Sequence, residues 1–138
     1  MKKKLSVLLG NPNAVECWRL WVDGVSQEES AIVVQGELQA GFFTASTPFC
    51  IDPAELSAFA VELSKLNETL TGEARLHASN AQSQVSAVFG VNELGHVQCK
   101  GVYAINGNRL EFTIGTDQTQ LAPLLVWVQS ALHYFERA

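Results

Sequence analysis

The sequence predicts an α+β fold: a mainly antiparallel sheet of about seven strands, with two helices. Three observations predict it. Most segments before residue 116 alternate apolar and polar residues with a period of two, two segments carry capped apolar stripes at helical spacing, and the links between the later strands are too short for parallel crossovers. The predicted order is βββ-α-ββββ-α. A length of 138 residues suits one domain, so residues 1–138 form a single predicted domain, with residues 1–13 set apart as a potentially flexible N-terminal segment.

The first strand group covers residues 16–23, 30–40 and 42–46. In its first strand Trp18, Leu20 and Val22 share one face, so we expect Trp18 in the core. Trp21 breaks this alternation. It therefore lies either beneath a covering element or on the surface, where tryptophan is enriched at binding hot spots.

A helix follows this group. Asp52 is the predicted N-cap, Pro53 occupies the first helical position, and Glu55 stands three residues after the cap. Apolar residues then recur at helical spacing to about Asn67, while Glu62 falls off this stripe and is predicted to be solvated.

Four further strands are predicted near residues 74–78, 85–91, 97–105 and 110–114. The Asn-Gly pair at 106–107 suits the positive φ angles of a tight hairpin, which joins the last two strands. Short links at 80–83 and 92–95 complete an antiparallel meander. Asp117 then caps the last helix, with Gln120 in the capping-box position.

The net charge of the chain distinguishes between classes of binding partner. Fourteen acidic residues oppose nine basic ones, for a net charge of −5. Three of the basic residues are Lys2, Lys3 and Lys4, so the chain from Leu5 onward has only six. Nucleic-acid binders show the reverse footprint, so we expect no nucleic acid as a partner. The acidic charge either serves solubility, as in many soluble domains, or attracts a basic protein partner. The apolar runs are also shorter than the ~20 residues that a membrane helix needs.

The N-terminus and the cysteines favour the cytoplasm. After the initial Met-Lys-Lys-Lys, only residues 5–9 are apolar before Gly10, which is too short for the core of a signal peptide. Cys17, Cys50 and Cys99 are odd in number and widely spaced in apolar surroundings. In a reducing compartment such cysteines act as small core hydrophobes.

Motifs for catalysis and metal binding are missing from the sequence, so no catalytic, cofactor-binding or metal residues are assigned. The three histidines are dispersed. His96 and Cys99 are three apart on a predicted strand and point to opposite faces, so they cannot share a metal ion. Cys99 lies in an apolar set, which favours an inert thiol, although a partner histidine elsewhere in space could still activate it.

Several segments resemble a known family. They are Phe49–Leu56 leading into the first helix, Leu70–Leu76 with its Gly-Glu-Ala start, Leu110–Phe112, and Thr116–Leu121 at the entry to the last helix, which is the most specific piece. In this order they are similar to the WapI-type immunity proteins of bacterial polymorphic-toxin systems. The similarity extends from about Phe42 to Leu132.

The resemblance implies a non-enzymatic immunity protein, without cofactor, that binds and neutralises a cognate toxin domain in the cytoplasm. Such toxins are often nucleases with basic clefts, and the acidic chain would suit one of them. No residue roles carry over, so the partner-binding candidates come from exposure and charge: Trp21, Glu28 and Glu29. The alternative is a small-ligand-binding or accessory domain, with Cys99 or His77 at the mouth of a cavity. The oligomeric state is left open.

Overall fold

The computed structural model describes residues 5–79 and 83–137, and it confirms the α+β class. The elements follow the order ββββ-α-ββββ-α, with two short 3-10 turns. They are β1 (Ser6–Asn11), η1 (Pro12–Ala14), β2 (Glu16–Ser26), β3 (Ala31–Ala40), β4 (Phe43–Ile51), α1 (Pro53–Thr69), β5 (Glu73–Ser79), β6 (Ser83–Val91), β7 (Val97–Ile105), β8 (Asn108–Thr116), η2 (Gln118–Gln120) and α2 (Leu121–Arg137).

The described residues form eight strands, one more than the predicted seven, because β1 is absent from the predicted order. In the sequence, residues 5–9 are a run of only five apolar and small residues before a Gly-Asn-Pro-Asn loop, which is short for a strand. It becomes a strand because it pairs with β2, where Leu9 lies opposite Trp18. Val7 and Leu9 are buried there, so this part of the N-terminal segment contributes to the core.

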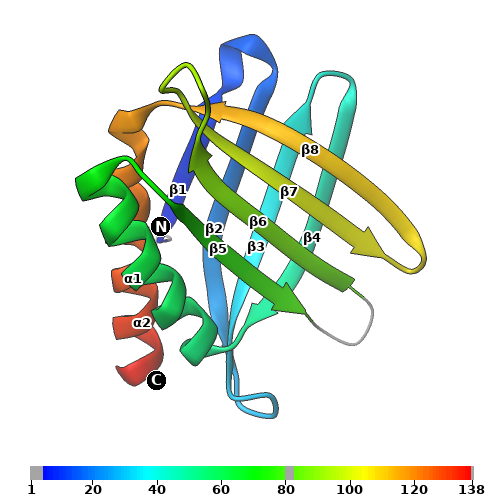
Figure 1. The fold of residues 1–138 in the computed structure, drawn as a ribbon. Helices are drawn as coiled ribbons and strands as arrows, with labels where there is room; N and C mark the ends of the chain where they lie inside the picture. The colour runs from blue at the N-terminus through cyan, green and yellow to red at the C-terminus, as the bar shows by residue number, and fades with distance from the viewer. Residues whose placement is uncertain (1–4, 80–82, 138) are drawn as a thin grey trace.

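The strands form two antiparallel sheets, in the orders β1-β2-β3-β4 and β5-β6-β7-β8. Figure 1 shows that the strands of one sheet cross those of the other. The sheets meet where β1 approaches β8 and where β4 approaches β5. The later four strands form the predicted meander, with hairpin registers such as Ile105 opposite Asn108.

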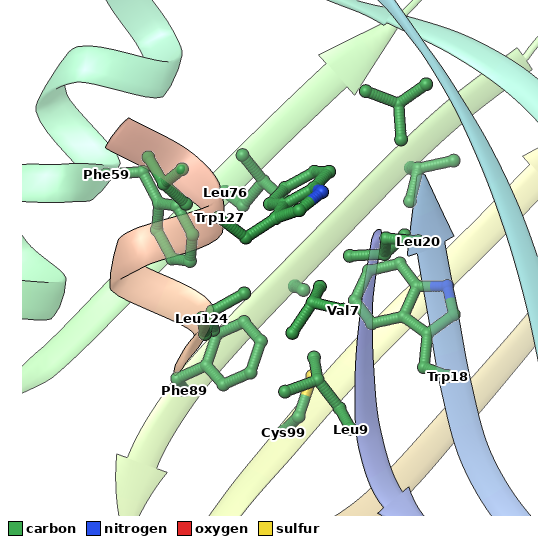
Figure 2. Close-up of a cluster of buried hydrophobic side chains, with 14 of the residues drawn as sticks. Val7, Leu9, Trp18, Leu20, Phe59, Leu76, Phe89, Cys99, Leu124 and Trp127 are labelled. Carbon is green, nitrogen blue, oxygen red and sulfur yellow. The ribbon is translucent and has the colours of Figure 1, made fainter. Parts of the chain in front are cut away.

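Both helices lie along one side of the two sheets (Figure 1). α1 packs against β5 and α2, and α2 also reaches β1. Their apolar faces enter one hydrophobic core that both sheets share (Figure 2). The residues labelled there come from seven elements: Val7, Leu9, Trp18, Leu20, Phe59, Leu76, Phe89, Cys99, Leu124 and Trp127. In the described part of the chain, neither helix is long and apolar enough to cross a membrane.

A buried hydrogen bond connects the sheets. Trp18 Nε1 on β2 donates to Tyr103 Oη on β7 at 2.7 Å, across 85 positions of sequence. Both side chains lie over Gly36 of β3, where a Cβ would come within 2.5 Å of the Tyr103 hydroxyl. Gly36 therefore makes room for a bond that satisfies two polar atoms inside the core. The prediction that Trp18 is a core residue is confirmed.

Candidate interaction surface

The three predicted contact residues all belong to the first sheet, but the structure does not bring them together. Trp21 is half-buried on β2, with Ser6 of β1 and Gln35 of β3 opposite it on either side. Glu28 and Glu29 are exposed in the turn after Ser26, at the end of the same strand. Ser26 lies five positions after Trp21, which is about 16 Å at strand spacing.

Glu29 also has a local structural role. Its backbone N–H donates to Ser26 Oγ at 3.2 Å, and its carboxylate contacts the thiol of Cys50. Partial burial, followed by the hydrogen bond and the negative charge of Glu29, raises the pKa of the Cys50 thiol to about 11. The thiol is therefore protonated, and a poor nucleophile, at neutral pH.

Cys50 is thus not the core hydrophobe that its apolar neighbours suggest, because it is only partly buried and faces a carboxylate. Cys17 and Cys99 are buried as predicted. Burial raises the pKa of the Cys99 thiol far above its usual range. The structure therefore favours an inert thiol at Cys99 over a nucleophile.

Four acidic residues collect at one end of the first sheet. Ile32 near the start of β3 pairs with Ile51 at the end of β4, so the β2–β3 turn and the start of α1 lie at the same end. We call the exposed residues Glu28, Glu29, Asp52 and Glu55 the acidic end. Asp52 is also the N-cap of α1, as predicted. Its Oδ1 accepts a 2.8 Å hydrogen bond from the N–H of Ala54.

Exposed apolar side chains occupy the opposite end of this sheet. β3 and β4 are joined by Gly41 and Phe42, and the Phe42 side chain is fully exposed, while Phe43 is 66% exposed. The N–H of Gly41, which has a φ of +65°, donates to Val15 O at 2.8 Å. This bond fixes the partly exposed Val15 beside the hairpin. We call Val15, Phe42 and Phe43 the hairpin tip.

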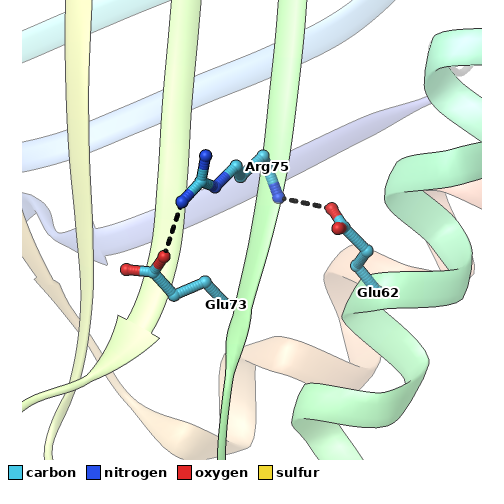
Figure 3. A network of polar contacts seen from close by, with 3 residues as sticks. All are labelled: Glu62, Glu73 and Arg75. Carbon is cyan, nitrogen blue, oxygen red and sulfur yellow. Dashed lines mark hydrogen bonds and ion pairs between the residues drawn. The ribbon is translucent and has the colours of Figure 1, made fainter.

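The edge strand β5 is covered by a side chain of α1 (Figure 3). Glu62 Oε1 accepts a 2.9 Å hydrogen bond from the backbone N–H of Arg75, and the Arg75 guanidinium pairs with Glu73 at 3.0 Å. Glu62 is exposed as predicted, but it is not simply solvated, because it occupies a donor of the sheet edge that would otherwise be open.

Two other edges have comparable partners. Glu16 Oε1 accepts from the N–H of Gly115 on β8 at 2.8 Å. Gln120 pairs with the backbone of Gly10 on β1, accepting from its N–H and donating to its carbonyl, both at 3.0 Å.

The acid–base and metal candidates remain scattered over separate elements. His77 is exposed on β5 and His133 on α2, and His96 lies in the β6–β7 turn, where its backbone N–H donates to Asn92 Oδ1 at 2.9 Å. Within residues 5–79 and 83–137, no three His, Cys, Asp or Glu side chains are grouped so that they could hold a metal ion.

The chain is similar to solved structures across nearly its whole length. It aligns with the crystal structure of WHY1 from Arabidopsis thaliana with a TM-score of 0.61 and 7% identity, covering 98% of this chain and 86% of that one. For MRP1/MRP2 of Trypanosoma brucei the TM-score is 0.56, with 15% identity and coverage of 97% and 86%. For the plant transcriptional regulator PBF-2 it is 0.54, with 10% identity and coverage of 99% and 92%. At such identities these likenesses show the fold alone.

Sequence comparison identifies the family. No curated protein matches the sequence. The model of the immunity protein WapI-like family, however, matches residues 8–136, nearly the whole chain, and so it includes most of β1, all of β2–β4 and the segments that carry the resemblance. The chain therefore belongs to the immunity protein WapI-like family.

Proposed function

We propose that this protein is an immunity protein that binds a cognate toxin domain in the cytoplasm and neutralises it by occupying its surface, without catalysis of its own. The family match over residues 8–136 carries the proposal. The structure offers it exposed surfaces at both ends of the first sheet. Of its three thiols, two are buried and the third has its pKa raised to about 11 beside Glu29.

Charge supports a basic partner, with a nuclease domain as the leading class. The described residues include six Lys and Arg against all fourteen acidic residues. A basic active-site cleft would be attracted to the acidic end over several ångströms, which accelerates encounter more than it strengthens the final complex. Trp21, Glu28 and Glu29 remain the contact candidates on this side of the protein.

The likeness to a plant transcriptional regulator does not bring nucleic-acid binding to this chain, because a shared fold carries many unrelated functions. Binding to phosphates requires clustered basic side chains. On the outer face of the second sheet, the two arginines Arg75 and Arg109 are each paired with a glutamate, Glu73 and Glu111. Their charge is therefore largely compensated.

Association kinetics test the role of the acidic end. The wild type and a Glu28→Gln/Glu29→Gln variant are measured against the C-terminal domain of the protein encoded immediately upstream of this chain, taken as the candidate toxin domain. We expect the association rate to fall severalfold at low salt, while the dissociation rate changes little. The control is Glu68→Gln/Glu93→Gln, which removes the same charge from exposed positions on α1 and the β6–β7 turn.

If the two double variants slow association equally, the effect is one of net charge and the acidic end is not a contact. If neither changes the rate, Glu28 and Glu29 lie outside the interface. A protein that fails to rescue cells from the toxin domain when the two are co-expressed would contradict the immunity function itself and leave the ligand-binding alternative ahead.

A further inference from the structure

We infer that the hairpin tip, Val15 with Phe42 and Phe43, is the apolar anchor of the toxin interface, entering a hydrophobic pocket of a basic toxin domain. The inference rests on the proposed function. It places the main energetic contact at the opposite end of the first sheet from the acidic end, about 30 Å away along the ten residues of β3.

The exposure of Phe42 supports this inference. A two-residue turn with Gly at its first position needs no aromatic residue at its second, and polar residues are usual at such a tip. Here Phe42 is fully exposed and Phe43 is 66% exposed. Large aromatic side chains with no partner in the fold are enriched among the few residues that dominate binding energy.

The backbone conformation of Val15 supports the same inference. It has a φ of 55° and a ψ of 39°, the left-handed region that a β-branched residue rarely adopts. Two backbone hydrogen bonds hold it there, to Pro12 O at 3.1 Å and from the Gly41 N–H at 2.8 Å. An exposed valine maintained in a strained conformation beside two exposed phenylalanines indicates selection for its surface rather than for the fold.

The surroundings of the tip suit an interface. The tip lies at the start of β4, where Thr44 and Gln39 form the neighbouring pair and can provide a polar rim. Two phenylalanines bury roughly 300–500 Å² together, whereas each partner in a standard complex buries about 800 Å². The tip is therefore the centre of a contact that must extend over the neighbouring strands.

Charge decides between two occupants of the tip. A second copy of this chain would bring two bodies of net charge −5 together, which repel each other. A basic toxin domain is attracted instead. The net negative charge of the whole chain, rather than a contact at the acidic end, would then assist docking of the tip.

Dissociation kinetics with the upstream-encoded toxin domain test the inference. For Phe42→Ser and for Phe42→Ser/Phe43→Ser we expect the dissociation rate to rise on the order of tenfold or more, with little change in association. Val15→Asn, which tolerates the left-handed backbone, should weaken binding while leaving the melting temperature of the free protein unchanged or higher. The control is Val61→Ser/Val126→Ser, which removes two exposed apolar side chains from the helices.

The outcomes separate the two claims. Wild-type binding with an unchanged dissociation rate in Phe42→Ser/Phe43→Ser overturns the anchor but keeps the immunity function. An equal effect of the helix control also overturns the anchor, because any loss of surface apolarity would then suffice. If the wild type does not bind the toxin domain, both claims fail. A wild-type dimer in sedimentation that becomes monomeric in Phe42→Ser assigns the tip to a second copy, and so contradicts the inference.

Discussion

At the residue scale, Glu29 shows how one side chain sets the chemistry of another. The Glu29 carboxylate contacts the Cys50 thiol and, together with partial burial, raises its pKa to about 11. Neither the contact nor the exposure of Cys50 follows from local sequence. Cys50 stands between Phe49 and Ile51, which are buried, and only the pairing of β4 with β3 turns it outward toward the β2–β3 turn.

We expect Glu29→Gln to lower the pKa of the Cys50 thiol, because the thiolate no longer faces a negative charge. Burial remains, so the pKa should stay above the ordinary value of 9.0. Each unit of decrease raises the thiolate fraction about tenfold at a pH below both values. The rate of alkylation by iodoacetamide, followed as a function of pH on the native protein, measures the change, with Cys17 and Cys99 protected by burial.

Glu28→Gln is the matched control for this measurement, since Glu28 is not a cause of the Cys50 shift. An alkylation profile that is the same in wild type and Glu29→Gln would show that the carboxylate does not act on the thiol.

At the scale of elements, the sequence predicted the features that depend on interactions between residues close together in the chain. The cap at Asp52, the Asn-Gly hairpin and the apolar stripes are confirmed, because each depends on residues within one or two turns of each other. The capping box of Asp117 and Gln120 also forms, but it caps the 3-10 turn η2 that leads into α2 rather than α2 itself. Long-range partners could not be predicted in this way. Glu62 caps an edge strand 13 residues later, and β1 forms a strand by pairing with its neighbour β2.

Gln120 combines both kinds of interaction. Its capping-box bond, from the N–H of Asp117 to Oε1 at 3.3 Å, is local and was predictable. Its two bonds to Gly10 cross 110 positions and join the end of β1 to the start of α2. A residue in the most specific segment of the family resemblance therefore has a structural role in this chain.

We expect Gln120→Ala to lower the free energy of unfolding by about 2 kcal/mol, because two partly buried hydrogen bonds and one exposed hydrogen bond are lost and the Gly10 backbone keeps no side-chain partner. Urea unfolding measures the change. Gln118→Ala, at an exposed position of the same 3-10 turn, should cost well under 1 kcal/mol. Equal losses for the two variants would contradict the role assigned to Gln120.

At the scale of the whole molecule, the core depends on contacts between the sheets. Period-two alternation predicted that Trp18 faces inward, and the structure buries it. It could not show that the two strand groups form separate crossed sheets, because alternation is the same in either arrangement. The aromatic contacts of Trp18 with Tyr103 and Phe112 arise only in the crossed packing.

We expect Gly36→Ala to destabilise the protein by about 2–4 kcal/mol. The new methyl group would lie within 2.5 Å of Tyr103 Oη and 3.0 Å of the Phe49 ring, so the buried bond between Trp18 and Tyr103 must shift. Gly90→Ala on β6 is the control, because its nearest neighbour would be the Glu73 side chain at 3.5 Å, an ordinary contact. Both are compared by thermal unfolding, and equal stability of the two variants would contradict close packing over Gly36.

The central claim is that this acidic protein recognises a basic toxin domain, and calorimetry tests it most directly. The purified wild type is titrated with the toxin domain encoded immediately upstream, at low and at high salt. We expect tight one-to-one binding that weakens as salt rises, because charge attraction is screened while the apolar contact of the hairpin tip remains. No heat of binding at either salt concentration, with both proteins folded, would contradict it.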